Sequence, residues 1–85
     1  MVSFTYTIKE PMGLHARPAG IMVKELRPLP CSVKVSCGSR SADGKKLFAL
    51  MGMAVKCGET VLVEIDGEDE EKVKTSLQSF FQSNF

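Results

Sequence analysis

The segment Val2-Ser3-Phe4-Thr5-Tyr6-Thr7-Ile8 alternates strictly between apolar and polar side chains. An alternation with a period of two is typical of a β-strand that buries one face and leaves the other in water. Proline and glycine favour turns, so the following Pro11-Met12-Gly13 is expected to end the strand. The sequence therefore predicts a half-buried strand over residues 2–8, whose apolar face other parts of the chain must cover.

Two further segments show the same alternation. Residues 31–37 and residues 60–66 carry apolar side chains at every second position, and we expect both to be strands. A tight turn at Gly38-Ser39 leads into a fourth, short strand near residues 40–43. A strand rises about 3.3 Å per residue, which places Cys31 and Cys37 about 20 Å apart, too far for a disulfide. Both are predicted core residues, together with Val33, Val35, Val61, Val63 and Ile65.

Three other segments carry the spacing of amphipathic helices, with apolar residues three and four positions apart. The first helix begins at residue 16 and has Pro18 in its first turn, and Pro28 and Pro30 end it. A short apolar helix is predicted over residues 46–53, and a last helix follows Asp69, the expected N-cap residue. The expected buried stripes are Ala19, Met22, Val23 and Leu26 in the first helix and Val73, Leu77, Phe80 and Phe81 in the last.

The order of these elements predicts the fold class. It reads β-α-β-β-α-β-α, and each strand has only one apolar face to cover. The helices can all cover that face from the same side, which leaves the face rich in Ser, Thr and Lys in water. We therefore expect an α+β protein, an open-faced two-layer sandwich in which three helices lie on one face of a four-stranded antiparallel sheet. A chain of 85 residues suffices for one such domain, over residues 1–85, and not for a second core.

The charge of the chain is nearly balanced overall but unevenly distributed. Eleven basic and ten acidic side chains give a net charge of +1, which argues against a nucleic-acid-binding protein that works through bulk positive charge. Residues 1–57 hold nine basic and three acidic side chains, net +6, whereas residues 58–85 hold two basic and seven acidic ones, net −5. The first part of the chain is thus expected to present a basic surface to an acidic partner.

Several classes of protein and site are excluded by what the sequence lacks. No apolar run reaches the roughly 18 residues that a membrane-spanning helix needs, and the first residues do not resemble a secretion signal. The three cysteines, an odd number, are expected as reduced thiols. With one histidine and no cysteine pair at metal-binding spacing, we expect no metal site. These features predict a cytoplasmic protein without membrane insertion.

Gly13-Leu14-His15-Ala16-Arg17-Pro18-Ala19 is the stretch best suited to chemistry. His15 is expected at the start of the first helix, where the N–H groups of Ala16 and Arg17 lack intrahelical partners and favour an anion. The Arg17 guanidinium adds donors that match phosphate oxygens. Because an unprotonated imidazole nitrogen is a nucleophile, the stretch predicts a histidine that can carry a phosphoryl group. No P-loop and no carboxylate cluster is evident, so we expect no nucleotide and no cofactor.

The predicted helix over residues 46–53 provides a candidate docking surface. A short helix on a small domain cannot bury apolar side chains around most of its circumference, so we predict an exposed apolar patch beside His15. A basic rim would suit a transient acidic partner. The patch is expected to consist of Ile21, Leu47, Phe48 and Met51, and its rim of Lys24, Arg27, Lys45 and Lys46. Three alternatives stay open: His15 is a helix cap or plain surface residue, Phe48 and Met51 are core residues, or the lysines are merely solvated.

The sequence resembles the HPr family, the histidine-containing phosphocarriers of the bacterial phosphoenolpyruvate:sugar phosphotransferase system. Residues 13–19 match the active-site motif of that family residue for residue. The likeness extends to the length, the element order, the segment from Lys45 to Met51 and Gly67-Glu68-Asp69-Glu70. The resemblance implies that phosphorylated enzyme I phosphorylates His15 on Nδ1 and that the group passes to the IIA component of a sugar permease. It also implies a stoichiometric carrier rather than an enzyme, and we expect a monomer.

Some positions depart from the family pattern. Many members carry a serine where this chain has Lys46, and a kinase phosphorylates that serine to control carbon catabolite repression, so we expect this switch to be absent. The other departures are Met12, Gly20 and Ala54, the last standing where glycine is usual. Two alternative functions remain. One is a regulatory module that acts by docking, against which the presence of both His15 and Arg17 argues; the other is a carrier of a dedicated or nitrogen-related phosphotransfer branch.

Overall fold

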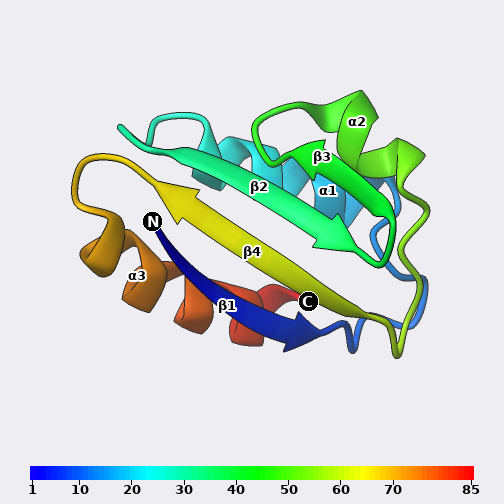
Figure 1. Cartoon of the computed structure of the whole chain (residues 1–85). Helices are drawn as coiled ribbons and strands as arrows, with labels where there is room; N and C mark the ends of the chain where they lie inside the picture. The colour runs from blue at the N-terminus through cyan, green and yellow to red at the C-terminus, as the bar shows by residue number, and fades with distance from the viewer.

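The computed structural model describes residues 1–85 and has the predicted α+β architecture, an open-faced sandwich of one sheet and three helices (Figure 1). The strands are β1 (Val2–Thr7), β2 (Ser32–Cys37), β3 (Arg40–Asp43) and β4 (Thr60–Asp66). The helices are α1 (Ala16–Leu26), α2 (Leu47–Gly52) and α3 (Glu70–Asn84). The predicted element order is confirmed, and the strand and helix ends differ from the expected ones by about a residue. No helix is both long enough and apolar enough to cross a bilayer.

The sheet has the order β1-β4-β2-β3, and every neighbouring pair of strands is antiparallel. β4 lies between β1 and β2, so that Val63 pairs with Phe4 on one side and with Val35 on the other. The side chains of Val61, Val63 and Ile65 are fully buried, as their alternation predicts. In Figure 1 α1 lies behind β2 and β3 and α3 lies behind β1, whereas α2 lies beside β3.

Phe81 of α3 is the largest fully buried side chain of the core. Its ring meets those of Phe4, Tyr6 and Phe85 edge to face, with centroid distances of 5.5, 5.7 and 5.1 Å. Edge-to-face pairs set the positive ring edge against the negative ring face, which stabilises them beyond the area that they bury. This aromatic cluster fixes α3 against β1.

The predicted core positions are confirmed with one exception. The four stripe residues of α1 are buried, and Cys31 and Cys37 are buried free thiols. The prediction is wrong for Phe80, which is only half-buried. Consecutive helical residues point about 100° apart, so only one of Phe80 and Phe81 can face the sheet. Phe81 does so, and Phe80 packs against its edge.

Asp69 is the N-cap residue of α3, as predicted, but its side chain does not cap the helix. Asp69 precedes α3 in a left-handed conformation, with φ +60° and ψ 24°, and its carboxylate makes no capping hydrogen bond. A side-chain cap needs an extended backbone at this position. The carboxylate of Glu70 instead accepts a hydrogen bond from the N–H of Gly67 at 3.2 Å and closes the turn before the helix.

Ala54, in the loop between α2 and β4, also adopts the left-handed conformation, with φ +51°. A β-carbon makes this region unfavourable by about 1–2 kcal/mol. We expect Ala54→Gly to raise the free energy of unfolding by about 0.5–1 kcal/mol, less than the strain itself because glycine also makes the unfolded chain more flexible. Urea denaturation followed by circular dichroism measures the change.

Ala49→Gly is the matched control for this prediction, because Ala49 is an exposed residue within α2. Glycine inside a helix lowers the free energy of unfolding by about 1 kcal/mol. The two glycine substitutions should therefore change stability in opposite directions, and equal losses would show that Ala54 is not strained.

Candidate functional site

The connection between β1 and α1 is fixed to the loop that precedes β4. The N–H of Leu14 donates to the carbonyl oxygen of Val55 at 2.9 Å, and the Leu14 side chain is buried. Gly13, with φ +69°, lies so close to Val55 that an added β-carbon would overlap its carbonyl oxygen and lie 2.7 Å from Cα of Lys56. His15, the next residue, therefore projects from a rigidly held stretch of backbone.

His15 is the N-cap residue of α1 and has an extended backbone, with φ −84° and ψ −171°. Its side chain makes no capping hydrogen bond and is 41% exposed. The alternative that His15 caps the helix through its side chain is therefore wrong. The imidazole is held at the surface with no hydrogen bond of its own to the fold.

Two backbone N–H groups in the first turn of α1 have no acceptor within the protein. The first intrahelical bond runs from the N–H of Ala19 to the carbonyl oxygen of His15 at 3.0 Å, and Pro18 has no N–H. The N–H groups of Ala16 and Arg17 are left without a partner. A helix N-terminus also carries a partial positive charge, so these two donors are suited to the oxygens of an anion.

The Arg17 side chain is exposed and takes part in no ion pair or hydrogen bond of the protein. With His15 it lines a shallow hollow of about 270 Å³, whose other residues are Glu10, Met12, Pro18, Ile21 and Asn84. The fold thus brings an uncommitted guanidinium and an exposed imidazole to one depression in the surface.

Glu10 is a residue of this site that the sequence analysis missed. Its Oε1 lies 3.8 Å from Nε2 of His15. This separation is too long for a hydrogen bond, so the carboxylate lies beside the imidazole as a nearby acidic group. No periodicity marks Glu10, and Asn84 reaches the same hollow from the far end of the chain, so neither has a local signal that could have revealed it.

Two of the four residues of the predicted apolar patch are exposed to solvent. Phe48 on α2 is 83% exposed and Ile21 on α1 is also exposed, whereas Leu47 and Met51 are half-buried against the core. The alternative that Phe48 is a core residue is therefore wrong. Leu50, on the opposite side of α2, is the residue that this helix buries completely.

Met12 extends this patch toward His15, which the sequence analysis did not predict. Its side chain is 73% exposed. Met12 lines the hollow that contains Arg17 and Ile21, and also a second hollow of about 260 Å³ that contains Met51. His15 borders both hollows, so Met12 and His15 lie together between the two helices.

The basic side chains of the predicted rim fall into two groups. Lys24, Arg27 and Lys46 are exposed, and their charged groups have no partner within the protein. Lys45 is half-buried instead, and its Nζ donates to the carbonyl oxygen of Leu29 at 2.8 Å. Lys45 therefore ties the residues just before α2 to the loop that follows α1, and its ammonium group is less available to a partner than the other three.

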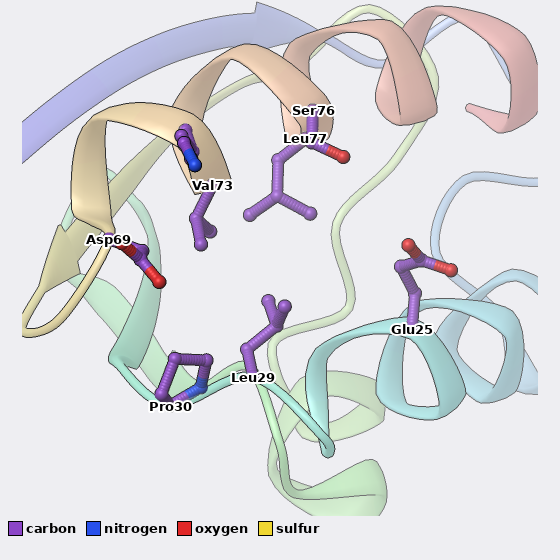
Figure 2. A pocket seen from close by; sticks show the side chains of 8 residues that line it. Glu25, Leu29, Pro30, Asp69, Val73, Ser76 and Leu77 are labelled. Atoms are coloured by element: carbon purple, nitrogen blue, oxygen red, sulfur yellow. The ribbon is translucent and has the colours of Figure 1, made fainter.

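A hollow of about 270 Å³ lies apart from these residues, between the C-terminal half of α1 and the start of α3 (Figure 2). Its lining residues are Glu25, Leu29, Pro30, Asp69, Lys72, Val73, Ser76 and Leu77. None of them is a predicted site residue. The protein contains no group of three or more His, Cys, Asp or Glu side chains that could hold a metal ion.

Comparison with known proteins identifies relatives that cover most of the chain. The family model described as the PTS HPr component phosphorylation site matches residues 2–83. The phosphocarrier protein HPr of Haemophilus influenzae is 40% identical over 65 residues, which cover 76% of each chain. That of Borreliella burgdorferi is 32% identical over 83 residues, or 98% of this chain and 96% of the relative. A crystal structure of HPr from Thermoanaerobacter tengcongensis has a TM-score of 0.91 at 29% identity and covers 100% of this chain and 96% of that one.

The match to the family model extends over nearly the whole chain and therefore includes the stretch around His15. The fold agrees as well, because the open-faced sandwich superposes on a solved member over its full length. The chain belongs to the HPr family of phosphocarrier proteins of the phosphotransferase system.

Proposed function

We propose that His15 is the phosphoryl acceptor of this phosphocarrier, which takes the group on Nδ1 from phosphorylated enzyme I and passes it to the IIA component of a sugar permease. The observation that carries the proposal is the exposed imidazole at the start of α1, next to the unpartnered N–H groups of Ala16 and Arg17. A nucleophile, two amide donors and a free guanidinium are the groups that a phosphoryl transfer needs when no metal takes part.

The chemistry follows from the two ring nitrogens of His15. With its proton on Nε2, facing Glu10, the neutral ring attacks phosphorus through the lone pair of Nδ1. The Nδ1–phosphorus bond forms as the bond to the donor breaks, and that electron pair stays with enzyme I. The ring becomes positively charged, which the carboxylate of Glu10 stabilises. The amides and Arg17 stabilise the phosphoryl oxygens.

The return step is the same reaction with the protein as donor. The IIA component supplies the nucleophile, the Nδ1–phosphorus bond breaks, and the electron pair returns to the imidazole of His15. The protein ends unchanged only after both steps, so it is a stoichiometric carrier rather than an enzyme, and it needs no cofactor. We expect it to work as a monomer in the cytoplasm, where it exchanges partners quickly through small interfaces.

The docking surface for both partners is proposed to be the apolar patch of Ile21, Leu47, Phe48 and Met51, extended by Met12. Phe48 is its most exposed member, and aromatic side chains are common anchors of interfaces. Lys24, Arg27 and Lys46 form the rim that attracts acidic partners, while Lys45 contributes mainly by holding α2 in place. Lys46 occupies the N-cap position of α2, so no phosphoserine can form there.

Phe48→Ala is expected to weaken docking and to leave the chemistry intact. The KM for phosphorylated enzyme I should rise by about tenfold, because the buried anchor of an interface contributes roughly 1–2 kcal/mol, with kcat unchanged. Steady-state kinetics at varied concentrations of the carrier measure both quantities. Leu62→Ala is the matched control, since Leu62 is an exposed apolar residue on the open face of the sheet. A fall in kcat with KM unchanged would argue against Phe48 as a docking residue.

The proposed function is tested by incubating the protein with phosphoenolpyruvate and enzyme I. We expect a phosphate that is stable in base and labile in acid, as a phosphorus–nitrogen bond requires, and its loss on addition of a sugar-type IIA component. Transfer to a nitrogen-related IIA component alone would assign the protein to that branch. The proposal would be overturned in favour of a docking module by two results together: no labelling by enzyme I of the sugar branch or of the nitrogen-related branch, and capture of a partner protein that is equally strong for His15→Ala.

A further inference from the structure

Arg40 of β3 binds groups in three different segments of the chain. Its Nη2 lies 2.6 Å from Oε2 of Glu59, in the loop before β4. Its Nη1 donates to the carbonyl oxygens of Met53 at 2.8 Å and Ala54 at 3.4 Å, just after α2. Its Nε donates to the carbonyl oxygen of Cys37 in β2 at 3.3 Å. The planar guanidinium thus holds the loop over residues 53–59 against the β2–β3 hairpin.

Glu59 fixes the same loop a second time. Its Oε1 accepts a hydrogen bond from the N–H of Lys56 at 2.8 Å while Oε2 binds Arg40. The hydrogen bond from the Lys56 N–H lowers the pKa of the Glu59 carboxyl, and the Arg40 guanidinium lowers it further. The hydrogen bond that Arg40 donates to Glu59 raises the pKa of Arg40 in turn. Both groups are therefore charged at neutral pH, and both oxygens of the carboxylate are engaged.

The segment held in this way is the one on which the phosphorylation site rests. Val55 is buried, and its carbonyl oxygen accepts the hydrogen bond from Leu14 and packs on Gly13. Ala54, Val55 and Lys56 also line one of the two hollows beside His15. A shift of Val55 would therefore move the two residues that immediately precede His15.

We propose that Arg40 and Glu59 are positioning residues for the phosphorylation of His15. They hold residues 53–56 in the conformation from which Val55 places Gly13, Leu14 and thereby the imidazole. The inference rests on the proposed function of His15 and extends it to a pair of charged side chains that do not touch the site.

The left-handed conformation of Ala54 explains why such a clamp is needed. An alanine disfavours φ +51°, so the loop would relax to a different turn unless its carbonyl groups were held. The Nη1 of Arg40 binds the carbonyl oxygen of Ala54 and that of the preceding residue, Met53. These two carbonyl groups flank the strained φ angle. A glycine at position 54 would adopt the turn without strain, and the clamp would then matter less.

The test compares Arg40→Met, which removes the charge and every donor, with the same change in an Ala54→Gly background. Phosphorylation by phosphoenolpyruvate and enzyme I gives kcat and KM, and amide hydrogen exchange gives the protection of the Leu14 N–H. We expect Arg40→Met to lower kcat roughly tenfold with little change in KM, because a small misplacement of a nucleophile costs rate rather than docking. Ala54→Gly should restore most of that loss.

Val73→Ala is the control for a general loss of stability, since Val73 lies in α3 away from this loop. Glu59→Gln, which keeps the shape of the side chain, should act in the same direction as Arg40→Met. The inference would be overturned by an unchanged kcat in Arg40→Met, by an equal fall of kcat in Val73→Ala, or by a kcat of Arg40→Met that Ala54→Gly does not restore. If the wild-type protein accepts no phosphoryl group, the proposed function fails. The positioning role of Arg40 is refuted separately if the Leu14 N–H is as well protected from hydrogen exchange in Arg40→Met as in the wild type.

Discussion

Replacing His15 with alanine is expected to abolish phosphorylation of the protein by phosphoenolpyruvate and enzyme I and to leave its fold intact. His15 is the only histidine of the chain, so no second imidazole can take its place. Its side chain is exposed and makes no hydrogen bond within the fold, so the free energy of unfolding should change by no more than about 0.5 kcal/mol. Radiolabel incorporation and urea denaturation measure the two effects.

Cys57→Ser is the matched control for the loss of a nucleophile, because Cys57 has the one exposed thiol of the protein. This variant should incorporate as much phosphate as the wild-type protein. Residual labelling of His15→Ala, or loss of labelling in Cys57→Ser, would place the phosphoryl group on a different residue from the one proposed.

Gly13→Ala is expected to cause the largest loss of stability of any substitution considered. The new β-carbon adds strain at φ +69°, which costs about 1–2 kcal/mol, and it overlaps the carbonyl oxygen of Val55. That oxygen belongs to a hydrogen-bonded backbone and cannot move freely, which adds about 1–3 kcal/mol of overpacking. The sum is a decrease of about 2–5 kcal/mol in the free energy of unfolding, measured by urea denaturation.

Gly38→Ala separates these two causes. Gly38 has φ +62°, nearly the same backbone, but an added β-carbon would meet no atom within 4 Å. We expect this variant to lose about 1–2 kcal/mol of unfolding free energy, the strain alone. If Gly13→Ala lost no more than Gly38→Ala, the close packing of Gly13 on Val55 would not be what holds the site in place.

The strands could be predicted well because a single property, apolar alternation, encodes both the strand and its buried face. Val61, Val63 and Ile65 are apolar at every second position, and all three are fully buried. The prediction failed where the backbone conformation decides the outcome. Asp69 has the side chain of an N-cap, but its left-handed backbone prevents the hydrogen bond, and no feature of the local sequence announces that conformation.

The centre of the candidate site could also be located from the sequence, because His15 and Arg17 lie within a few residues on one helix start. The rest depends on residues that are distant in the chain. Glu10 and Asn84 join the site only through the fold, and the ion pair between Arg40 and Glu59 links positions that are 19 residues apart. The charge pattern of the sequence likewise does not predict that Lys45 donates a hydrogen bond to a backbone carbonyl.

We propose that the protein carries its phosphoryl group on Nδ1 of His15, and NMR of the phosphorylated protein identifies the nitrogen that holds it. With ¹⁵N-labelled protein, phosphoenolpyruvate and enzyme I, we predict a one-bond coupling between ³¹P and Nδ1 of His15, with the proton on Nε2. A coupling to Nε2, a phosphorus signal assigned to any other residue, or no phosphorylation under conditions that phosphorylate the Haemophilus influenzae protein would show that Nδ1 of His15 is not the carrier atom.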